Sequence, residues 1–261
     1  MNRILYIDGF NFYYGVTQHW KERDPKLVGL GWCDFGALMR KLFGPKEGFR
    51  IKYFTSPVTQ NAEIAGHRPG EHERYSLWLR ALATIGNLSI IRGYYKDGSA
   101  ERPDARWKAR EEKQTDVNLA IEMLMDAFGP PEGRPDHVIL LSGDTDLMPA
   151  IFALQERFAR PIHVTVLLPS NGNRDQWSAT YNETRTRLRK CHGVSRTDTI
   201  PGRPLDVRLL DETILANCLL PYELRDANGA FFCPPYWRLE ENFLSEHCET
   251  LKRRPDLARC S

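Results

Sequence analysis

Residues 137–147 of this chain read HVILLSGDTDL and give the clearest indication of its fold. Five largely apolar residues lead into a Ser-Gly turn, and two carboxylates, Asp144 and Asp146, follow one residue apart. A short apolar run that ends at a glycine is typical of a buried parallel strand. The two acids are therefore expected at the carboxyl end of a strand, where open α/β sheets bind their ligands. Because carboxylates near a core need a compensating charge, a divalent cation is the expected companion.

Apolar strands alternate with amphipathic helices on both sides of this stretch. The pattern predicts strands at residues 3–7, 49–54, 88–95, 137–141 and 161–169, and helices at residues 34–42, 71–85, 116–128, 147–158 and 175–190. Such alternation predicts an α/β fold with a parallel, doubly wound sheet of roughly five strands.

The alternation uses residues 1–195, and the rest of the chain changes character. Residues 196–261 contain six prolines, and one short helix is expected there at residues 211–219. We therefore expect a domain over residues 1–195 and a proline-rich C-terminal extension over residues 196–261 that packs on the core or on a partner. The aromatic residues of this extension would also allow a homodimer.

The helix expected at residues 116–128 has the clearest periodicity. Its apolar residues recur at helical spacing and predict a buried stripe of Val117, Ala120, Ile121, Leu124 and Phe128. Asp116 lies in the first turn, where a negative charge suits the helix dipole. Since Asp116 borders the stripe, its carboxylate is expected to face the edge of the sheet.

Three separate elements thus send acids to one sheet edge: Asp8 follows the first strand, Asp116 begins a helix, and Asp144 and Asp146 follow the fourth strand. In a doubly wound sheet the first and fourth strands flank the point where the chain reverses direction. Four ionised carboxylates there would repel each other, so either their pKa values rise or cations occupy the cluster. Oxygen ligands favour Mg²⁺ or Mn²⁺, and no Cys or His accompanies these acids in the sequence, which argues against zinc.

Each of these acids also has a purely structural interpretation. Asp8 could form a turn before Gly9, Asp116 could simply favour the start of its helix, and Asp144 and Asp146 could form a turn and a helix cap. Asp146 fits the cap of the following helix best, which leaves Asp144 as the better candidate for direct metal contact.

Three motifs occur in order along the chain: IDGFN at Ile7–Asn11 with Tyr13-Tyr14 behind it, KQTDV at Lys113–Val117, and LSGDTD at Leu141–Asp146. Together they resemble the NYN domain, which belongs to the PIN-like nuclease superfamily, over about residues 1–195. The resemblance implies a Rossmann-like, three-layer α/β/α sandwich with a mainly parallel sheet of five to six strands. It also implies RNA cleavage that depends on Mg²⁺ or Mn²⁺.

The resemblance further implies roles for individual side chains. It assigns catalytic metal binding to Asp8, Asp116, Asp144 and Asp146, with a supporting catalytic role for Asn11. On the substrate side, Lys113 would hold a phosphate, and Ser142 and Thr145 would supply orienting hydroxyls.

The leading functional hypothesis is a metal-dependent endoribonuclease for single-stranded RNA. A metal-bound hydroxide would attack phosphorus and leave a 5′-phosphate and a 3′-hydroxyl. The basic residues around Trp107, in residues 102–113, suit a single strand, although a solvated charged loop fits this mixed-charge segment better. The alternatives are a non-catalytic RNA-binding or regulatory module on the same fold and a small-molecule enzyme. The chain lacks Gly-x-Gly-x-x-Gly after its first strand, which counts against a dinucleotide cofactor.

Composition sets broad limits. The chain has a hydrophobic content of 41% and a charged content of 27%, which are ordinary for a globular protein. Its net charge of +2 does not by itself indicate a nucleic-acid-binding protein. No apolar run reaches the ~18–20 residues of a spanning helix, and the start turns acidic too early for a signal peptide, so a cytoplasmic protein without membrane contact is expected. The six cysteines, without C-x-x-C, are expected as reduced thiols.

Overall fold

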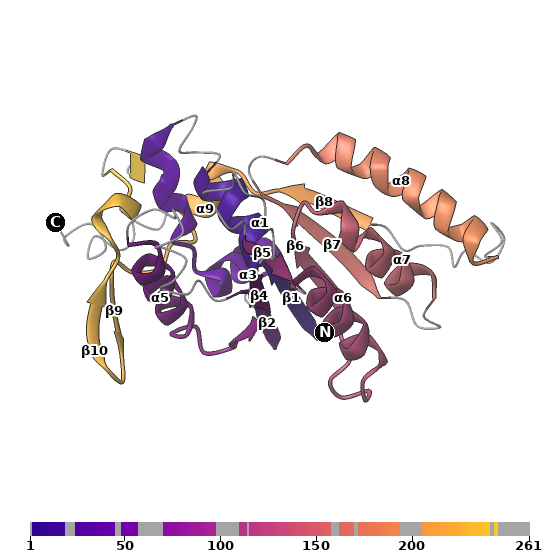
Figure 1. Cartoon of the computed structure of the whole chain (residues 1–261), viewed down its shortest axis with the longest axis horizontal. Coiled ribbons are helices and arrows are strands. Elements are labelled where there is room, and N and C mark those ends of the chain that lie inside the picture. The colour runs from indigo at the N-terminus through magenta and orange to yellow at the C-terminus, as the bar shows by residue number, and fades with distance from the viewer. Residues whose placement is uncertain are drawn as a thin grey trace.

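The computed structural model describes residues 2–18, 24–44, 48–56, 70–97, 110–113, 115–157, 162–169, 172–193, 205–240 and 243–244. Figure 1 shows these parts as a central sheet with helices packed around it. In this described part of the chain, no helix is both long and apolar enough to cross a membrane.

Six parallel strands form the central sheet, in the order β3-β2-β1-β6-β7-β8. Their bounds are β1 (Arg3–Asp8), β2 (Phe49–Thr55), β3 (Leu88–Arg92), β6 (His137–Leu141), β7 (His163–Leu168) and β8 (Leu205–Leu209). Two small antiparallel pairs lie outside it: β4 (Tyr94–Asp97) with β5 (Arg110–Lys113), and β9 (Glu223–Asp226) with β10 (Gly229–Phe232). The chain builds outward from β1 through β3 and then returns to the other side of β1, so the direction reverses between β1 and β6.

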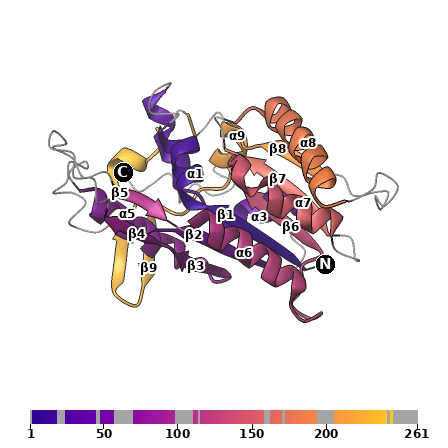
Figure 2. The same cartoon turned by 45° about the vertical axis from the view of Figure 1, so that its right-hand side comes forward.

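Helices cover both faces of the sheet, which makes three layers (Figure 2). One apolar core takes Leu5 and Ile7 of β1, and the other takes Ile4 and Tyr6, because successive strand residues point to opposite faces. The first core is covered by α1 (Gly9–Tyr13), α3 (Phe35–Phe43), α5 (Glu71–Leu82) and α9 (Glu212–Ala216), and the second by α6 (Thr115–Phe128), α7 (Met148–Glu156) and α8 (Arg174–Cys191). The predicted α/β/α sandwich with a parallel sheet is confirmed.

Short helical turns complete the described elements: η1 (Tyr14–Gln18), η2 (Pro25–Gly31), η3 (Thr145–Leu147) and η5 (Pro235–Trp237). The single strand expected at residues 88–95 is instead divided at Gly93. Its first half, β3, is the edge of the large sheet, and the second half, β4, leaves the sheet to pair with β5.

The sixth strand, β8, comes from the region that the sequence placed in the C-terminal extension. The expected boundary at residue 195 therefore falls between α8 and the last strand of the sheet. Further along, Trp237 packs into the first core, with its ring 5.7 Å from that of Trp32 and 6.1 Å from that of Trp78. The Trp32 indole also donates a hydrogen bond to the carbonyl of Pro221, 3.1 Å away. The described residues after β8 thus pack on the core.

The buried face of α6 differs from the predicted stripe. Leu119, Met123 and Ala127 are fully buried against the sheet, whereas Ala120 and Leu124 are only partly buried. The other members of the predicted stripe are exposed: Val117 at 58%, Ile121 at 51% and Phe128 at 69%. The prediction was wrong for these three residues.

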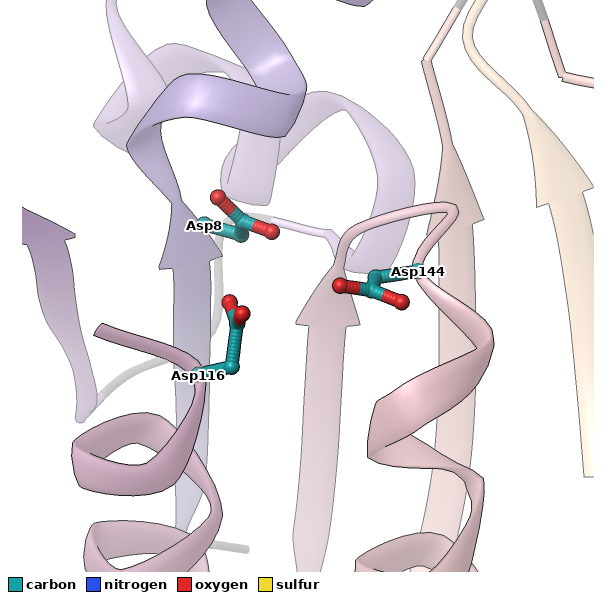
Figure 3. A group of neighbouring side chains, drawn as sticks. All are labelled: Asp8, Asp116 and Asp144. Carbon is teal, nitrogen blue, oxygen red and sulfur yellow. The ribbon is translucent and has the colours of Figure 1, made fainter. Parts of the chain in front are cut away.

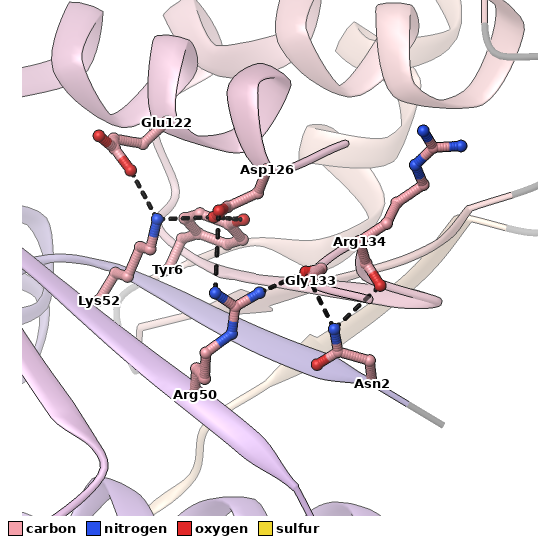
Figure 4. A network of polar contacts seen from close by, with 8 residues as sticks. All are labelled: Asn2, Tyr6, Arg50, Lys52, Glu122, Asp126, Gly133 and Arg134. Carbon is pink, nitrogen blue, oxygen red and sulfur yellow. Dashed lines mark hydrogen bonds and ion pairs between the residues drawn. The ribbon is translucent and has the colours of Figure 1, made fainter. Parts of the chain in front are cut away.

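A polar network sets the rotation of α6 (Figure 4). The Lys52 ammonium on β2 lies 2.5 Å from a carboxylate oxygen of Glu122 and 2.7 Å from one of Asp126. The Tyr6 hydroxyl on β1 donates to the same Asp126 carboxylate at 2.6 Å. Because these half-buried charges are costly without partners, the helix turns Glu122 and Asp126 toward the sheet. The neighbouring apolar residues therefore face outward.

The described cysteines are free thiols, as the sequence analysis expected. Cys33, Cys218 and Cys233 are buried and Cys191 is exposed. The remaining two, Cys248 and Cys260, lie outside the described residues.

Candidate metal centre

Three aspartates converge at the point where the sheet reverses direction. Asp8 ends β1, Asp116 lies in the first turn of α6, and Asp144 follows β6 (Figure 3). Each offers a carboxylate oxygen, and these oxygens all lie within 4.8 Å of one another. Oxygen ligands bind Mg²⁺ at about 2.0–2.1 Å, so ligands on opposite sides of one ion are roughly 4.2 Å apart. The three carboxylates thus fit a single hard divalent cation after small adjustments.

Hydrogen bonds fix the Asp8 carboxylate. Its side chain is only 4% exposed. One oxygen accepts the backbone N–H of Asn11 at 3.0 Å, which caps α1, and the other accepts the hydroxyl of Ser142 at 3.0 Å. The next residue must be glycine, because a Cβ on Gly9 would lie 2.6 Å from the carbonyl oxygen of Phe54. The close approach of α1 to β2 therefore keeps Asp8 at the carboxyl end of β1.

The loop after β6 is joined to Asp8 by two side chains. The Ser142 hydroxyl, which donates to Asp8, also accepts the backbone N–H of Asp144 at 3.0 Å. The side-chain oxygen of Asn11 accepts the backbone N–H of Gly143 at 2.8 Å. The ends of β1 and β6 are thereby tied together, which brings Asp8 and Asp144 to the same place. Ser142 and Asn11, singled out from the sequence, both lie at this junction.

Asp116 is the most exposed of the three carboxylates, yet its pKa is raised above the ordinary value. Partial burial is the larger cause, and the negative charges of Asp144 and Asp146 add to it. The start of α6 is held by Thr115, whose buried hydroxyl lies 3.0 Å from that of Ser56 at the end of β2. The sequence analysis missed Thr115 and Ser56, although the position of Ser56 after a predicted strand could have drawn attention to it.

The other predicted site residues lie less centrally. Asp146 is exposed and is not among the three converging carboxylates, although its charge acts on Asp116. The helical turn that begins at Thr145 is capped by Asp144, which accepts the backbone N–H of Asp146 at 2.9 Å, so the cap expected of Asp146 was assigned to the wrong residue. Thr145 is exposed. Lys113 ends β5, and its side chain lies outside what the structure describes.

Two neighbouring cavities open at this edge of the sheet. The larger, which we call the acid cleft, measures about 460 Å³ and is lined by Asp8, Phe10, Asn11, Tyr14, Gly15, Asp116, Gly143, Asp144 and Gly172. The smaller, which we call the aromatic pocket, measures about 60 Å³ and is lined by Gly9, Phe10, Tyr13, Tyr14, Tyr53, Thr55, Arg74, Tyr75, Trp78 and Trp237. Phe10 and Tyr14 line both cavities. The aromatic pocket was not predicted from the sequence.

The NYN domain family model matches residues 3–176, which include every residue of the acid cleft. This chain belongs to the NYN domain family. The match confirms the family resemblance seen in the three sequence motifs, and it ends before β8 and before Trp237. The family carries a nuclease-like fold, and the cluster of three aspartates lies inside the matched region.

Two further proteins are similar to this NYN-family chain. The 6-hydroxy-3-succinoylpyridine 3-monooxygenase HspA of Pseudomonas putida is 30% identical over 200 residues, which cover 64% of this chain and 59% of that protein. The match thus spans about three fifths of the relative's length. A solved structure of a protein of unknown function from Vibrio parahaemolyticus is 16% identical, with a TM-score of 0.43, and the match covers 80% of this chain and 93% of that one.

Proposed function

We propose that the acid cleft binds Mg²⁺ or Mn²⁺ and hydrolyses the phosphodiester bonds of single-stranded RNA. One observation carries the proposal: carboxylates from three separate elements, Asp8, Asp116 and Asp144, lie within 4.8 Å of one another. The negative charges of Asp144 and Asp146 help to raise the pKa of Asp116, and a bound divalent metal would offset this repulsion. Membership of the NYN family, with its nuclease-like fold, supports the same reading.

The three aspartates would hold the metal, and the residues around them would orient these ligands. When bound, such an ion lowers the pKa of a coordinated water and offsets the charge of a phosphate. Ser142 and Asn11 keep Asp8 and the loop of Asp144 in register through their hydrogen bonds. Asp146, exposed and close enough to act on the pKa of Asp116, is available to accept the proton of the attacking water. Water oxygen then bonds to phosphorus, the bond from phosphorus to the 3′-oxygen breaks, and the 3′-oxygen takes up a proton.

The test is cleavage of end-labelled single-stranded RNA by the whole chain, with Mn²⁺ or with EDTA. We expect cleavage with Mn²⁺, none with EDTA, and products with a 5′-phosphate and a 3′-hydroxyl. Asp144→Asn should remove the activity. A matched control is Glu132→Gln, because Glu132 is an exposed carboxylate beyond the far end of α6.

Equal cleavage in Mn²⁺ and EDTA, or undiminished cleavage by Asp144→Asn, would contradict the proposal. RNA binding without turnover, unchanged in Asp144→Asn, would instead indicate a non-catalytic RNA-binding module on the same fold.

The aromatic pocket favours one second candidate, oxidation of a small aromatic ring. The Pseudomonas relative is named for an activity on a hydroxypyridine, and the pocket beside the acid cleft is walled by aromatic side chains. A monooxygenation places one atom of O₂ on the substrate and releases the other as water, so it needs two electrons from a reductant such as NADH. Oxygen consumption that depends on both NADH and 6-hydroxy-3-succinoylpyridine would support this candidate, and its absence would remove it.

A further inference from the structure

The geometry points to the aromatic pocket as a binding site for a pyrimidine base, which places a pyrimidine nucleotide next to the phosphate in the acid cleft. The position of the phosphate rests on the proposed nuclease function, whereas binding of the base does not. Nothing in the family match or in the named relative assigns such a site. Four features of the pocket carry this inference: the wall that it shares with the acid cleft, its aromatic inner wall, its polar groups and its size.

The pocket and the acid cleft share part of their walls. Phe10 and Tyr14 line both cavities. Phe10 lies in α1, which begins directly after Asp8, and Tyr14 follows the end of that helix. Their rings stack with centroids 6.4 Å apart and an angle of 23°. Tyr14 is 54% exposed, so one side of its ring is open to a ligand. A ring held in the pocket would therefore have its attached sugar and phosphate directed along Tyr14 into the acid cleft.

The inner wall of the pocket is rigid. Trp78 and Trp237 are buried in the first core, with ring centroids 6.1 Å apart and planes almost perpendicular. The Trp78 indole donates a hydrogen bond to the Tyr53 hydroxyl at 3.0 Å. Side chains held in this way offer a preformed aromatic surface, and a nucleobase stacks on such a surface at little further cost in conformational entropy.

The pocket also carries a few polar groups that suit the edge of a base. Among its described lining residues, Arg74 carries the only charge, and its guanidinium lies 5.9 Å from the ring centroid of Tyr236. The hydroxyls of Thr55 and Tyr75 lie 3.1 Å apart at the same wall. Arginine donates to carbonyl oxygens and hydroxyls both donate and accept, which matches the carbonyl and N–H groups of uracil or cytosine.

The size of the pocket favours one ring over two fused rings. The volume of the pocket, about 60 Å³, is far smaller than the volume of about 460 Å³ of the acid cleft. A base with one ring enters so small a space more easily than a base with two fused rings. The expected base is therefore a pyrimidine.

The test is tryptophan fluorescence of the whole chain during titration with uridine in EDTA, because Trp78 and Trp237 report directly on the pocket and no cleavage can occur. Uridine lacks a phosphate and so is not repelled by the metal-free carboxylates. We expect a saturable change with uridine and at least tenfold weaker binding of adenosine. Tyr14→Ala should weaken uridine binding about tenfold, since stacking on one aromatic ring is lost.

Two further variants separate binding from folding. Arg74→Gln keeps the shape of the wall and should also weaken uridine binding, while Phe232→Ala removes an aromatic ring that is 52% exposed and lies outside the pocket, and should bind normally. Circular dichroism checks the fold of each variant. No saturable change with uridine, equal binding of adenosine, or unaltered binding by both pocket variants would overturn the inference. Tighter binding of 6-hydroxy-3-succinoylpyridine than of uridine would overturn the nucleotide assignment.

The outcome is distinguishable from failure of the proposed function. Uridine binding without RNA cleavage would remove the nuclease proposal and leave the base site standing. RNA cleavage without uridine binding would remove the base site and leave the nuclease proposal standing.

Discussion

The acid cleft and the aromatic pocket share Phe10 and Tyr14 but are built in opposite ways. The acid cleft gathers charged residues at the ends of strands and the start of a helix, and hydrogen bonds of Ser142 and Asn11 hold Asp8 and the loop of Asp144. The pocket gathers uncharged rings from distant parts of the chain, and close packing in the core holds them. In the acid cleft, removal of a polar group changes the position and the charge of the carboxylates. In the aromatic pocket, removal of a ring reduces the surface that a ligand can contact.

Because the two cavities are built so differently, RNA cleavage and base recognition should be separable by mutation. The carboxylates contribute charge where a phosphate reacts, while the rings contribute a surface for a base that does not react. Changes in the acid cleft should alter turnover with little effect on uridine binding, and changes in the pocket should alter which sites are cut.

The largest expected effect comes from Asp8→Asn or Asp144→Asn. Each substitution replaces one negatively charged metal ligand with a neutral side chain of similar shape. Metal-dependent RNA cleavage should therefore fall by about 10²–10³-fold or more. Uridine binding, followed by tryptophan fluorescence, should remain within about twofold of the original. Loss of both properties together would show that cleft and pocket are not independent, and Glu132→Gln serves as the control.

Ser142→Ala should have the next largest effect. It removes the hydroxyl that donates to Asp8 and accepts from the backbone of Asp144, so both carboxylates lose a fixed position. Loss of such a supporting group costs about 10–100-fold in metal affinity or activity. The measurement is the Mn²⁺ concentration needed for half-maximal cleavage. Ser178→Ala removes an exposed hydroxyl from α8 and should leave that concentration unchanged.

Tyr14→Ala should change the choice of cleavage site rather than abolish cleavage. If the pocket holds a pyrimidine, cleavage of a random single-stranded RNA pool should favour positions beside pyrimidines. The variant should lose several-fold of that preference, because one stacking partner is gone. Sequencing the ends of the products provides the measurement, and an unchanged preference would contradict the link between pocket and cleft.

The smallest expected effect concerns the thermal stability of the metal-free protein. Partial burial and the charges of Asp144 and Asp146 raise the pKa of Asp116, so the folded state favours its protonated form more than the unfolded state does. The resulting destabilisation grows as pH rises from about the ordinary carboxyl pKa through the raised one. In EDTA at pH 7, Asp116→Asn should therefore raise the Tm by about 1–3 °C, and the gain should vanish near pH 3.

Added Mn²⁺ sharpens the same experiment. It should raise the Tm of the original chain, because a ligand that binds only the folded state stabilises it, and should raise that of Asp116→Asn less. A variant that loses Tm in EDTA at pH 7 would show that the three carboxylates do not repel one another.

Much of the acid cleft was predictable because its signals are local in the sequence. An apolar run followed by an acid marks the end of a parallel strand, and such ends meet at one edge of the sheet. The strand ends indicate Asp8 and Asp144, and the start of an amphipathic helix indicates Asp116. The structure brings these three together. The sequence pattern also included Asp146, which lies outside the three, because two acids one residue apart cannot be distinguished before the loop geometry is known. In the structure, Asp144 caps the helical turn η3.

Other features depend on neighbours that lie far away in the sequence. The edge strand β8 is a short segment of mixed polarity among prolines, so its strand character comes from pairing with β7. The rotation of α6 depends on Lys52, about 70 residues before Glu122, and apolar periodicity alone predicted the wrong face.

The alternating α/β order, the parallel sheet and the edge where the acids gather could be predicted from the residues, because they follow from hydrophobic periodicity and strand ends. Which acids converge, which way α6 faces and where the aromatic pocket lies depend on contacts between segments that are distant in the chain. The pocket joins residues from Gly9 to Trp237, so no local pattern carries it. These features depend on packing and charge pairing between distant segments. A buried side chain must fit every neighbour around it, and most of those neighbours come from other segments of the chain.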